Sequence, residues 1–301
     1  MHKSKLFTFF FINSVFSLIY FPAMATVVKI IEPTIVVGSW SNAFSGVAGS
    51  LATTDLTGQG GNLESAVPAG SGALKLETTA SGDSRAEVRL ERNGGFGTVS
   101  DLLSSGSVSY NYYQESGGPS ATITPAFKFE VFDFTNISGD GFATFVFEPV
   151  YNGGVGAFDT WHNVTIDFAT ANFWVPGNGL YGVSGKMLDQ NNQEQFIYTN
   201  TLSDWLALYD DVVLDTFLDA FIGSISFGIG SGTPSQTGYV DDVNFSSNFA
   251  ALDEQITINA DFESDVQVSA VPLPAALPLY ATGLGLMGFL GWRKRRKKVS
   301  A

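Results

Sequence analysis

The sequence predicts an all-β protein, a two-sheet β-sandwich of the jelly-roll type with one packed helix. Apolar and polar residues alternate with a period of two through most of the stretch between residues 26 and 265. Stretches rich in glycine, serine and asparagine separate the alternating segments, as turns do between strands. The chain has no cysteine, so its stability must come from apolar burial in a core rather than from disulfide bonds.

Eight segments have a residue pattern expected of strands. In the segment 126–131, Phe127 and Phe129 point to the side opposite Lys128 and Glu130. A second segment is apolar almost throughout, which predicts a central strand. The eight predicted strands cover residues 73–77, 86–91, 107–112, 126–131, 142–147 (the apolar one), 161–168, 224–229 and 239–245.

One segment, residues 202–221, follows the helical period instead. Its apolar side chains recur at helical spacing, and most of its aspartates fall off that stripe. The stripe consists of Leu202, Trp205, Leu206, Tyr209, Val212, Val213 and Phe217. We expect a helix that packs over a sheet edge or over one face of the sandwich, because an acidic polar face argues against a membrane-surface helix.

The N-terminal end has the three parts of a secretory signal peptide. Residues 2–5 are mostly basic, residues 6–21 form an apolar core rich in phenylalanine, and Ala23 and Ala25 have the small-x-small spacing of a cleavage site. The alternative is an N-terminal anchor that is not cleaved.

The C-terminal end has the features of a membrane span with a stop-transfer signal. Residues 275–292 carry no charge, and as a helix they would be roughly 27 Å long, close to the ~30 Å thickness of a bilayer core. Six basic residues follow, and by the positive-inside rule they hold this end in the cytoplasm. They are Arg293, Lys294, Arg295, Arg296, Lys297 and Lys298.

A short motif leads into this span, and it consists of Val271, Pro272, Leu273, Pro274 and Ala275. The motif, the span and the basic end together resemble the sorting signal of the PEP-CTERM class of exosortase substrates, in its Val-Pro-Leu-Pro-Ala variant. Leu273 departs from the class because it stands where the usual acidic residue would be.

That resemblance covers only the C-terminal end of the chain. It implies export, insertion of the precursor in the inner membrane, and cleavage near the motif by an exosortase-type sorting enzyme. The product would reach the cell surface or extracellular matrix of a Gram-negative-type bacterium. The alternative is an ordinary single-span anchor that is never processed.

These features divide the chain into five parts: a signal peptide (1–25), a β-sandwich domain (26–265), a linker with the sorting motif (266–274), a transmembrane helix (275–292) and a basic cytoplasmic tail (293–301). Two of the 15 lysines and arginines lie in the first part and six in the last, which leaves seven against all 29 acidic residues and a net charge near −22 for the rest. Such a surface repels phosphates, so nucleic acid is not an expected partner. It also offers oxygen ligands to calcium, although solubility outside the cell is the simpler explanation.

Two segments of the central domain are similar to the terminal strands of extracellular carbohydrate-binding jelly rolls and concanavalin-like sandwiches. They read Asp-Thr-Trp-His-Asn-Val-Thr-Ile-Asp at 159–167 and Gly-Tyr-Val-Asp-Asp-Val-Asn-Phe at 238–245. In those modules one carboxylate of the Asp-Asp-Val strand often serves a structural calcium ion, so the resemblance implies Asp241 or Asp242 as a metal ligand. Only one of the two can point into a given site, because adjacent strand residues face opposite sides. The alternative is two solvated acids at the start of a strand.

Binding of an extracellular polysaccharide would need exposed aromatic rings beside polar groups, because ring faces stack on the apolar faces of sugars. Trp174 and Trp161 are the candidate platforms, and Trp174 is favoured because it precedes the loop-like segment 176–179. The alternative for each is a place in the core, where aromatic residues on alternating strands are usually found.

Catalysis has little support in the sequence. Glycosidases need two carboxylates about 5 to 10 Å apart, but Glu130 and Asp133 are three residues apart and should face opposite sides of a strand. His162, next to a tryptophan, is expected to be structural, because no serine-nucleophile or zinc-binding motif accompanies it.

The expected role is therefore an exported surface or matrix protein that contacts glycans or serves a structural purpose. The alternative is a polysaccharide-active hydrolase or lyase of the same fold, which two carboxylates on one face of a cleft would favour. A purely space-filling surface protein would have neither a groove nor a ligand.

Overall fold

A computed structural model of the chain describes residues 27–30, 40–42, 49–92, 94–133, 141–154, 156–177, 180–210, 217–230, 234–250 and 253–263. The predicted signal peptide, sorting motif, transmembrane helix and basic tail lie outside these residues. Within the described ranges, no helix is long and apolar enough to cross a membrane.

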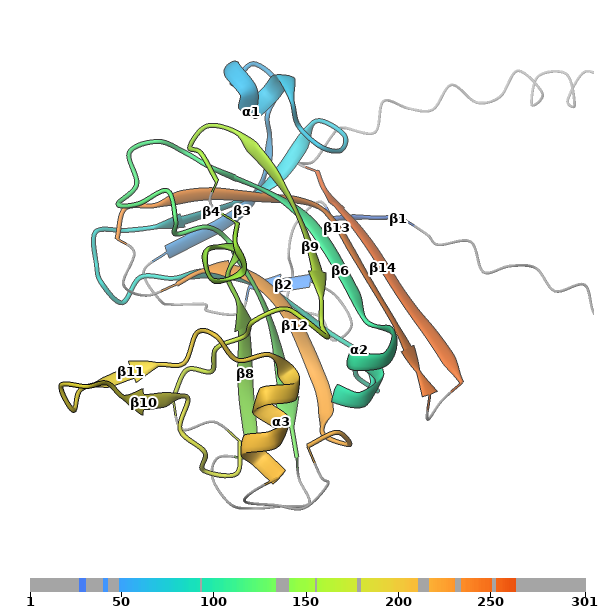
Figure 1. The fold of residues 1–301 in the computed structure, drawn as a ribbon. Coiled ribbons are helices and arrows are strands. Elements are labelled where there is room, and N and C mark those ends of the chain that lie inside the picture. Colours follow the sequence, from blue (N-terminus) through green and yellow to red (C-terminus); the bar gives the residue numbers. More distant parts are fainter. Residues whose placement is uncertain are drawn as a thin grey trace, which may run out of the picture.

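The larger of two packed sheets has seven strands (Figure 1). Its central strand is the longest one, and its partners on one edge change along its length: first β4, then β14. On the other edge that strand pairs with β6, which in turn pairs with β9. The strands are β1 (Val27–Ile30), β3 (Gly49–Asp55), β4 (Gly72–Thr78), β6 (Ser107–Gln114), β9 (Trp161–Asp167), the central β13 (Thr237–Phe249) and β14 (Glu254–Phe262).

The second sheet has five antiparallel strands in the order β2, β5, β12, β7, β8. They are β2 (Trp40–Asn42), β5 (Ala86–Glu91), β7 (Ala126–Phe132), β8 (Phe142–Phe147) and β12 (Phe221–Ile229). A separate two-stranded hairpin of β10 (Lys186–Leu188) and β11 (Glu194–Phe196) projects from the body of the domain (Figure 1).

This arrangement confirms the predicted β-sandwich, and all eight predicted strands are present. Two longer strands were not predicted. In β14, buried Ile256, Ala260 and Phe262 fall at alternate positions, so its sequence does carry the strand signal. In β3, by contrast, most residues are small or polar, and only pairing with β4 makes a strand of it.

Three α-helices are described rather than one: α1 (Gly61–Ser65), α2 (Val99–Ser105) and α3 (Leu202–Asp210), together with a short 3-10 helix, η1 (Pro149–Asn152). Helix α3 lies in the predicted segment 202–221, but the end of that prediction is wrong, because Phe221 begins β12. Helix α3 starts as α2 does, with a threonine and an aspartate three residues later that cap each other: Thr201 N–H donates to Asp204 Oδ2 at 2.9 Å, and Thr98 N–H donates to Asp101 Oδ2 at 2.9 Å. A seven-residue helix such as α2 is too short to show a helical period. Its capping residues, Thr98 and Asp101, were the sequence feature that could have predicted it.

The core between the sheets is strongly aromatic. Phe129 of β7 stacks on Phe145 of β8, with 5.1 Å between ring centroids and 10° between ring planes. Trp205 of α3 meets the edge of Phe145 and donates its indole N–H to the carbonyl of Phe173 at 2.8 Å. Helix α3 therefore extends the same core beyond the second sheet's edge strand.

We predict that Phe129→Ala lowers the free energy of unfolding by roughly 3–5 kcal/mol, because it leaves a cavity beneath fully buried rings. Met187→Ala is the control: this side chain is 55% exposed on the projecting hairpin, and its loss should change stability by less than about 0.5 kcal/mol. Equilibrium urea unfolding measures both variants. Equal effects of the two substitutions would contradict the placement of Phe129 in the core.

Candidate functional site

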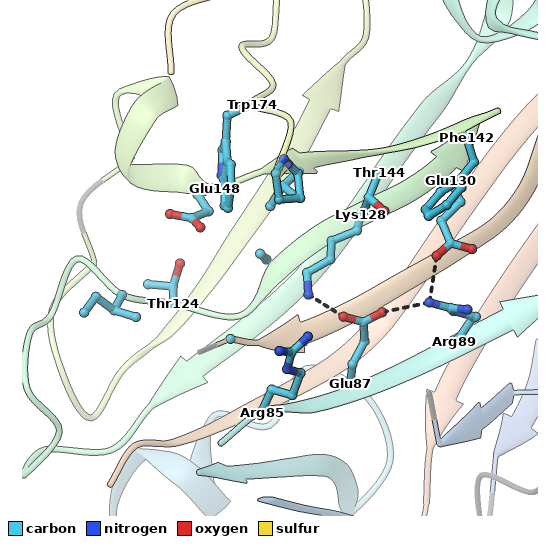
Figure 2. Close-up of a pocket in the computed structure, with 16 residues that line it drawn as sticks. Arg85, Glu87, Arg89, Thr124, Lys128, Glu130, Phe142, Thr144, Glu148 and Trp174 are labelled. Atoms are coloured by element: carbon cyan, nitrogen blue, oxygen red, sulfur yellow. Dashed lines mark hydrogen bonds and ion pairs between the residues drawn. The ribbon is translucent and has the colours of Figure 1, made fainter. Parts of the chain in front are cut away.

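The outer face of the five-stranded sheet carries a groove of about 480 Å³ (Figure 2). Alternation places every second residue of β5, β7 and β8 in the core, including Phe129 and Phe145, and turns the residues between them outward. The lining residues are Arg85, Glu87, Arg89, Ile123, Thr124, Ala126, Lys128, Glu130, Phe142, Thr144, Val146, Glu148, Trp174, Pro176, Gly228 and Gly230. Its volume lies within the range of small-molecule pockets.

Strand register sets the shape of the groove floor. Gly228 of β12 pairs with both Ala126 and Glu87, and Glu148 follows β8 at the level of Ala126 because Phe147 pairs with Phe127. Glu148 and Glu87 thus stand at the two sides of one cross-strand row, with an alanine and a glycine between them. A Cβ atom added at Gly228 would lie 2.9 Å from the Cβ of Glu87, so glycine is needed beneath this glutamate.

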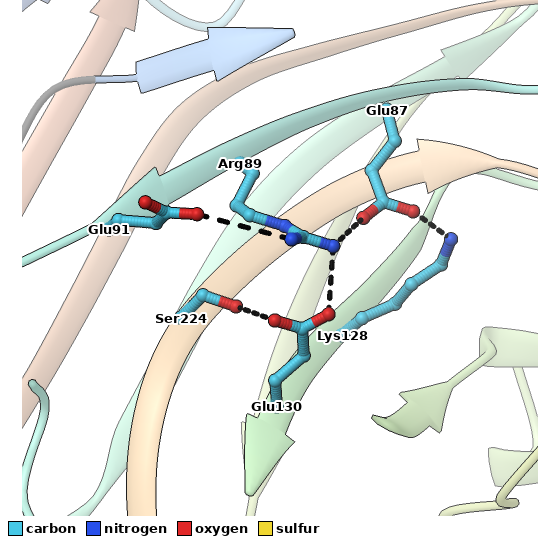
Figure 3. Close-up of polar contacts among 6 residues, drawn as sticks. All are labelled: Glu87, Arg89, Glu91, Lys128, Glu130 and Ser224. Carbon is cyan, nitrogen blue, oxygen red and sulfur yellow. Dashed lines mark hydrogen bonds and ion pairs between the residues drawn. The ribbon is translucent and has the colours of Figure 1, made fainter. Parts of the chain in front are cut away.

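Ion pairs hold four charged side chains of the groove, those of Glu87, Arg89, Lys128 and Glu130 (Figure 3). The Arg89 guanidinium lies 2.8 Å from a carboxylate oxygen of Glu130 and 3.7 Å from one of Glu87. Lys128 contacts the other oxygen of Glu87, and the Ser224 hydroxyl donates to Glu130 at 2.8 Å. Because Glu87 is almost fully buried, this network neutralises a carboxylate that burial would otherwise penalise.

The groove gathers cations in an acidic domain. Only seven lysines and arginines lie between residues 26 and 265, and three of them, Arg85, Arg89 and Lys128, line this groove. The groove is therefore less negative than the rest of the surface, which carries most of the 29 acidic residues.

Glu148 has a different environment from the other two carboxylates. Burial raises its pKa above the usual value, while the Trp174 indole and the Lys128 ammonium act in the opposite direction. Figure 2 shows Glu148 beside Trp174, with the Thr124 side chain pointing toward it.

Trp174 was predicted as a glycan platform, and the structure places it in the wall of the groove. Its backbone N–H and C=O bond with those of Val146 at 3.0 and 2.9 Å, which attaches its segment to the edge of β8. Its ring packs against Phe196 with 5.0 Å between centroids. At the opposite end of the groove, Phe142 is 43% exposed and stacks on Phe132.

Trp161, the second predicted platform, lies on the other sheet. Its indole N–H donates to the carbonyl of Leu63 in α1 at 3.1 Å, and its ring packs on Tyr113. These contacts give Trp161 a packing role and place it away from the groove.

Glu130 and Asp133, the two carboxylates considered for catalysis, face different directions, as their spacing predicts. Glu130 faces the groove, whereas Asp133 is buried and accepts a hydrogen bond from the Tyr181 hydroxyl at 2.6 Å. His162 lies 3.0 Å from the carbonyl of Ala157. Sequence reasoning did not single out Glu87 and Glu148 as site residues, because their joint position depends on a strand order that no local pattern encodes.

Asp241 lies where β13 changes partner from β4 to β14. Its side chain is fully buried, one oxygen accepts the Ala69 N–H at 3.1 Å, and the other accepts the Phe262 N–H at 3.3 Å. Asp242 points elsewhere and accepts a hydrogen bond from the Asn111 side chain at 3.1 Å. The two aspartates therefore face different sides. Asp241 links the backbone at Ala69 to the backbone at Phe262.

These contacts do not fit the predicted calcium site. Both oxygens of Asp241 already accept backbone amide hydrogens, which would point at an ion bound there. Within the described part of the chain, no group of three histidine, cysteine, aspartate or glutamate residues could hold a metal ion. Structural calcium stays a prediction from the resemblance, without support from the donor geometry.

No family model and no curated protein matches this chain. Among solved structures, it is similar to a family 11 carbohydrate-binding module of a cellulosomal cellulase from Clostridium thermocellum, at 15% identity and a TM-score of 0.36 over 73% of this chain and 94% of that one. A family 11 module from the same organism has been solved in complex with a β-1,3-1,4-mixed-linked tetrasaccharide, and this chain is 15% identical to it at a TM-score of 0.35.

A family 30 carbohydrate-binding module shows 14% identity and a TM-score of 0.34 over 69% of this chain and 98% of that one. A xylanase variant shows 13% identity and a TM-score of 0.32 over 74% and 95%. Scores at this level do not place the chain in any of these families, so the fold assignment depends on its own strand pairing.

The environment of Asp241 predicts a pH-dependent stability. Burial raises its pKa from 3.8 to about 7, so the folded protein takes up a proton between these values while the unfolded chain does not. The contribution of this carboxyl to the free energy of unfolding is at its maximum below the unfolded pKa. It is lost as pH rises through the folded pKa, and the loss amounts to up to about 4 kcal/mol. Asp241→Asn should flatten the fall in unfolding free energy between about pH 4 and about pH 7. Chemical denaturation with a chelator present measures this slope, and identical slopes in both proteins would contradict the assignment.

Proposed function

We propose that this protein is an exported, surface-delivered β-sandwich that binds polysaccharide in the groove of its five-stranded sheet. The observation that carries the proposal is the groove itself: aromatic side chains stand at its two ends, and hydrogen-bonding side chains are fixed between them. Trp174 and Phe142 offer apolar ring surface, and Arg89, Lys128 and Glu130 offer polar groups for sugar hydroxyls.

The ion pairs of the groove support binding of an extended, hydroxyl-rich chain. Side chains already held by Arg89 lose little rotamer freedom when a ligand arrives, so less of the binding energy is spent on ordering them. The acidic remainder of the surface argues against nucleic acid as the ligand.

The export and sorting parts of the proposal are supported by sequence features alone. The signal-peptide pattern ending at Ala25, the motif at 271–275 and the basic end at 293–298 favour a membrane-inserted precursor. An exosortase-type enzyme is the proposed processing partner, and the cell surface or extracellular matrix is the proposed destination.

A polysaccharide hydrolase or lyase is the second candidate, because Glu87, Glu130 and Glu148 share one face of the groove. The positive charge of Lys128 among these carboxylates makes the enzyme the weaker candidate. Lys128 contacts Glu87 and also acts on Glu148, so an ammonium group stands where a glycosidase would develop positive charge on the sugar.

We predict that Phe142→Ala weakens polysaccharide binding by about tenfold, since loss of one stacking ring costs on the order of 1 kcal/mol. Met187→Ala removes an exposed apolar side chain outside the groove and should leave the affinity unchanged. Calorimetric titration with soluble polysaccharides compares the two variants. The groove would be the wrong surface if both variants bound as the wild-type protein does.

We also predict that the mature protein in its native host begins near Thr26 and ends between Val271 and Ala275. Intact-mass spectrometry of membrane and secreted fractions measures both ends. A product that retains residues 293–298 would show a permanent anchor and rule out the sorting proposal.

A further inference from the structure

We propose that Thr124, Glu148 and Trp174 form a subsite at one end of the groove that accepts a single neutral sugar unit through its hydroxyl groups. The subsite would determine which polysaccharides the groove accepts. This inference depends on the proposed function, because it names the ligand class of the same groove.

The first observation is a buried hydroxyl group without a partner. Thr124 is only 6% exposed and lines the groove, yet its Oγ1 makes no hydrogen bond to any described residue. Leaving a buried hydroxyl unsatisfied costs about 1–3 kcal/mol, so native proteins keep few such groups. Figure 2 shows this side chain directed toward Glu148, on the groove side. Because Oγ1 itself is covered in the free protein, a ligand hydroxyl would satisfy it after rotation of the Thr124 side chain toward the groove.

A second polar atom at the same end is satisfied only weakly, by Glu148. The Trp174 indole N–H is buried and makes no hydrogen bond of normal geometry within the described residues, although it lies near enough to Glu148 to lower that group's pKa. Buried indole N–H groups usually find an acceptor. A sugar oxygen placed between Trp174 and Glu148 would supply one.

The mixture of groups favours hydroxyls over anionic substituents. The threonine hydroxyl both donates and accepts, the indole donates, and the glutamate carboxylate accepts, which matches the mixed character of sugar hydroxyls. A uronate or a sulfate would place a second negative charge beside Glu148, in a domain whose net charge is already near −22. Lys128 does not offset this charge fully, because it also contacts Glu87.

The floor beside these residues leaves space for a sugar ring. Ala126 and Gly228 lie in the same cross-strand row as Glu148, and neither has a side chain beyond Cβ. The ring can therefore approach the sheet closely while its hydroxyls reach the three polar side chains. Lys128 projects from the next outward position of β7, and its ammonium reaches Glu87 at the far side of the same row, whereas Glu130 lies farther along the groove.

The test is calorimetric titration of the full chain, purified in detergent, against soluble neutral β-glucan, xylan and galactan and against anionic alginate and polygalacturonate. We expect a neutral polysaccharide to bind most tightly. Thr124→Val should weaken that binding by about tenfold, because it removes one ligand hydrogen bond, while thermal stability stays equal or rises because a buried unsatisfied group is lost. Thr165→Val, at an exposed position of β9, is the matched control and should change neither quantity.

Glu148→Gln tests the charge argument separately. It keeps an acceptor at the same place and removes the negative charge, so affinity for the anionic polysaccharides should rise relative to the neutral ones.

The subsite is overturned if the wild-type protein prefers alginate or polygalacturonate. It is also overturned if Thr124→Val raises thermal stability and binds like the wild-type protein, since the hydroxyl would then be only a packing defect. If none of the five polysaccharides binds, the proposed function fails, and the subsite with it.

Discussion

Burial of the aromatic inner face of the five-stranded sheet is the interaction on which the groove depends. Phe129 and Phe145 stack inside the sandwich, and alternation then turns Lys128, Glu130 and Thr144 outward. A slip of one residue in register would carry charged groups into the core, so core packing strongly fixes the direction of every groove side chain. The groove is consequently formed before any ligand is present.

The ion-pair network holds this preformed groove in one arrangement. Glu87 is nearly buried and would be costly alone, but Lys128 and Arg89 both reach it from neighbouring positions. Each of these cations comes from a different strand, so the network also links β5 to β7 across β12. The same contacts therefore provide stability and hold the groove in a geometry ready for a ligand. Thr124 Oγ1 and the Trp174 indole N–H, by contrast, have no hydrogen bond of normal geometry to any residue that the structure describes.

In the larger sheet, Asp241 stabilises a break in the regular strand pairing. The edge of β13 passes from β4 to β14 at this point, and the Asp241 carboxylate accepts amide hydrogens from Ala69 and Phe262. A buried acid that hydrogen-bonds to two backbone segments accounts for Asp241 in this strand as well as a role in metal binding would. The same Asp-Asp-Val sequence can thus serve either role, and only the direction of the surrounding donors distinguishes them.

By itself, the sequence determined the fold class and most of the strands, because a period of two and turn-forming residues are local signals that burial on one face preserves. It also identified α3 from its apolar stripe and Trp174 from the loop that follows it. It could not show that Glu87, Lys128 and Glu148 share a groove, that Trp161 packs under α1, or that Asp241 faces amide hydrogens. Those facts depend on which distant strands become neighbours, and tertiary structure decides that through the packing of the two sheets.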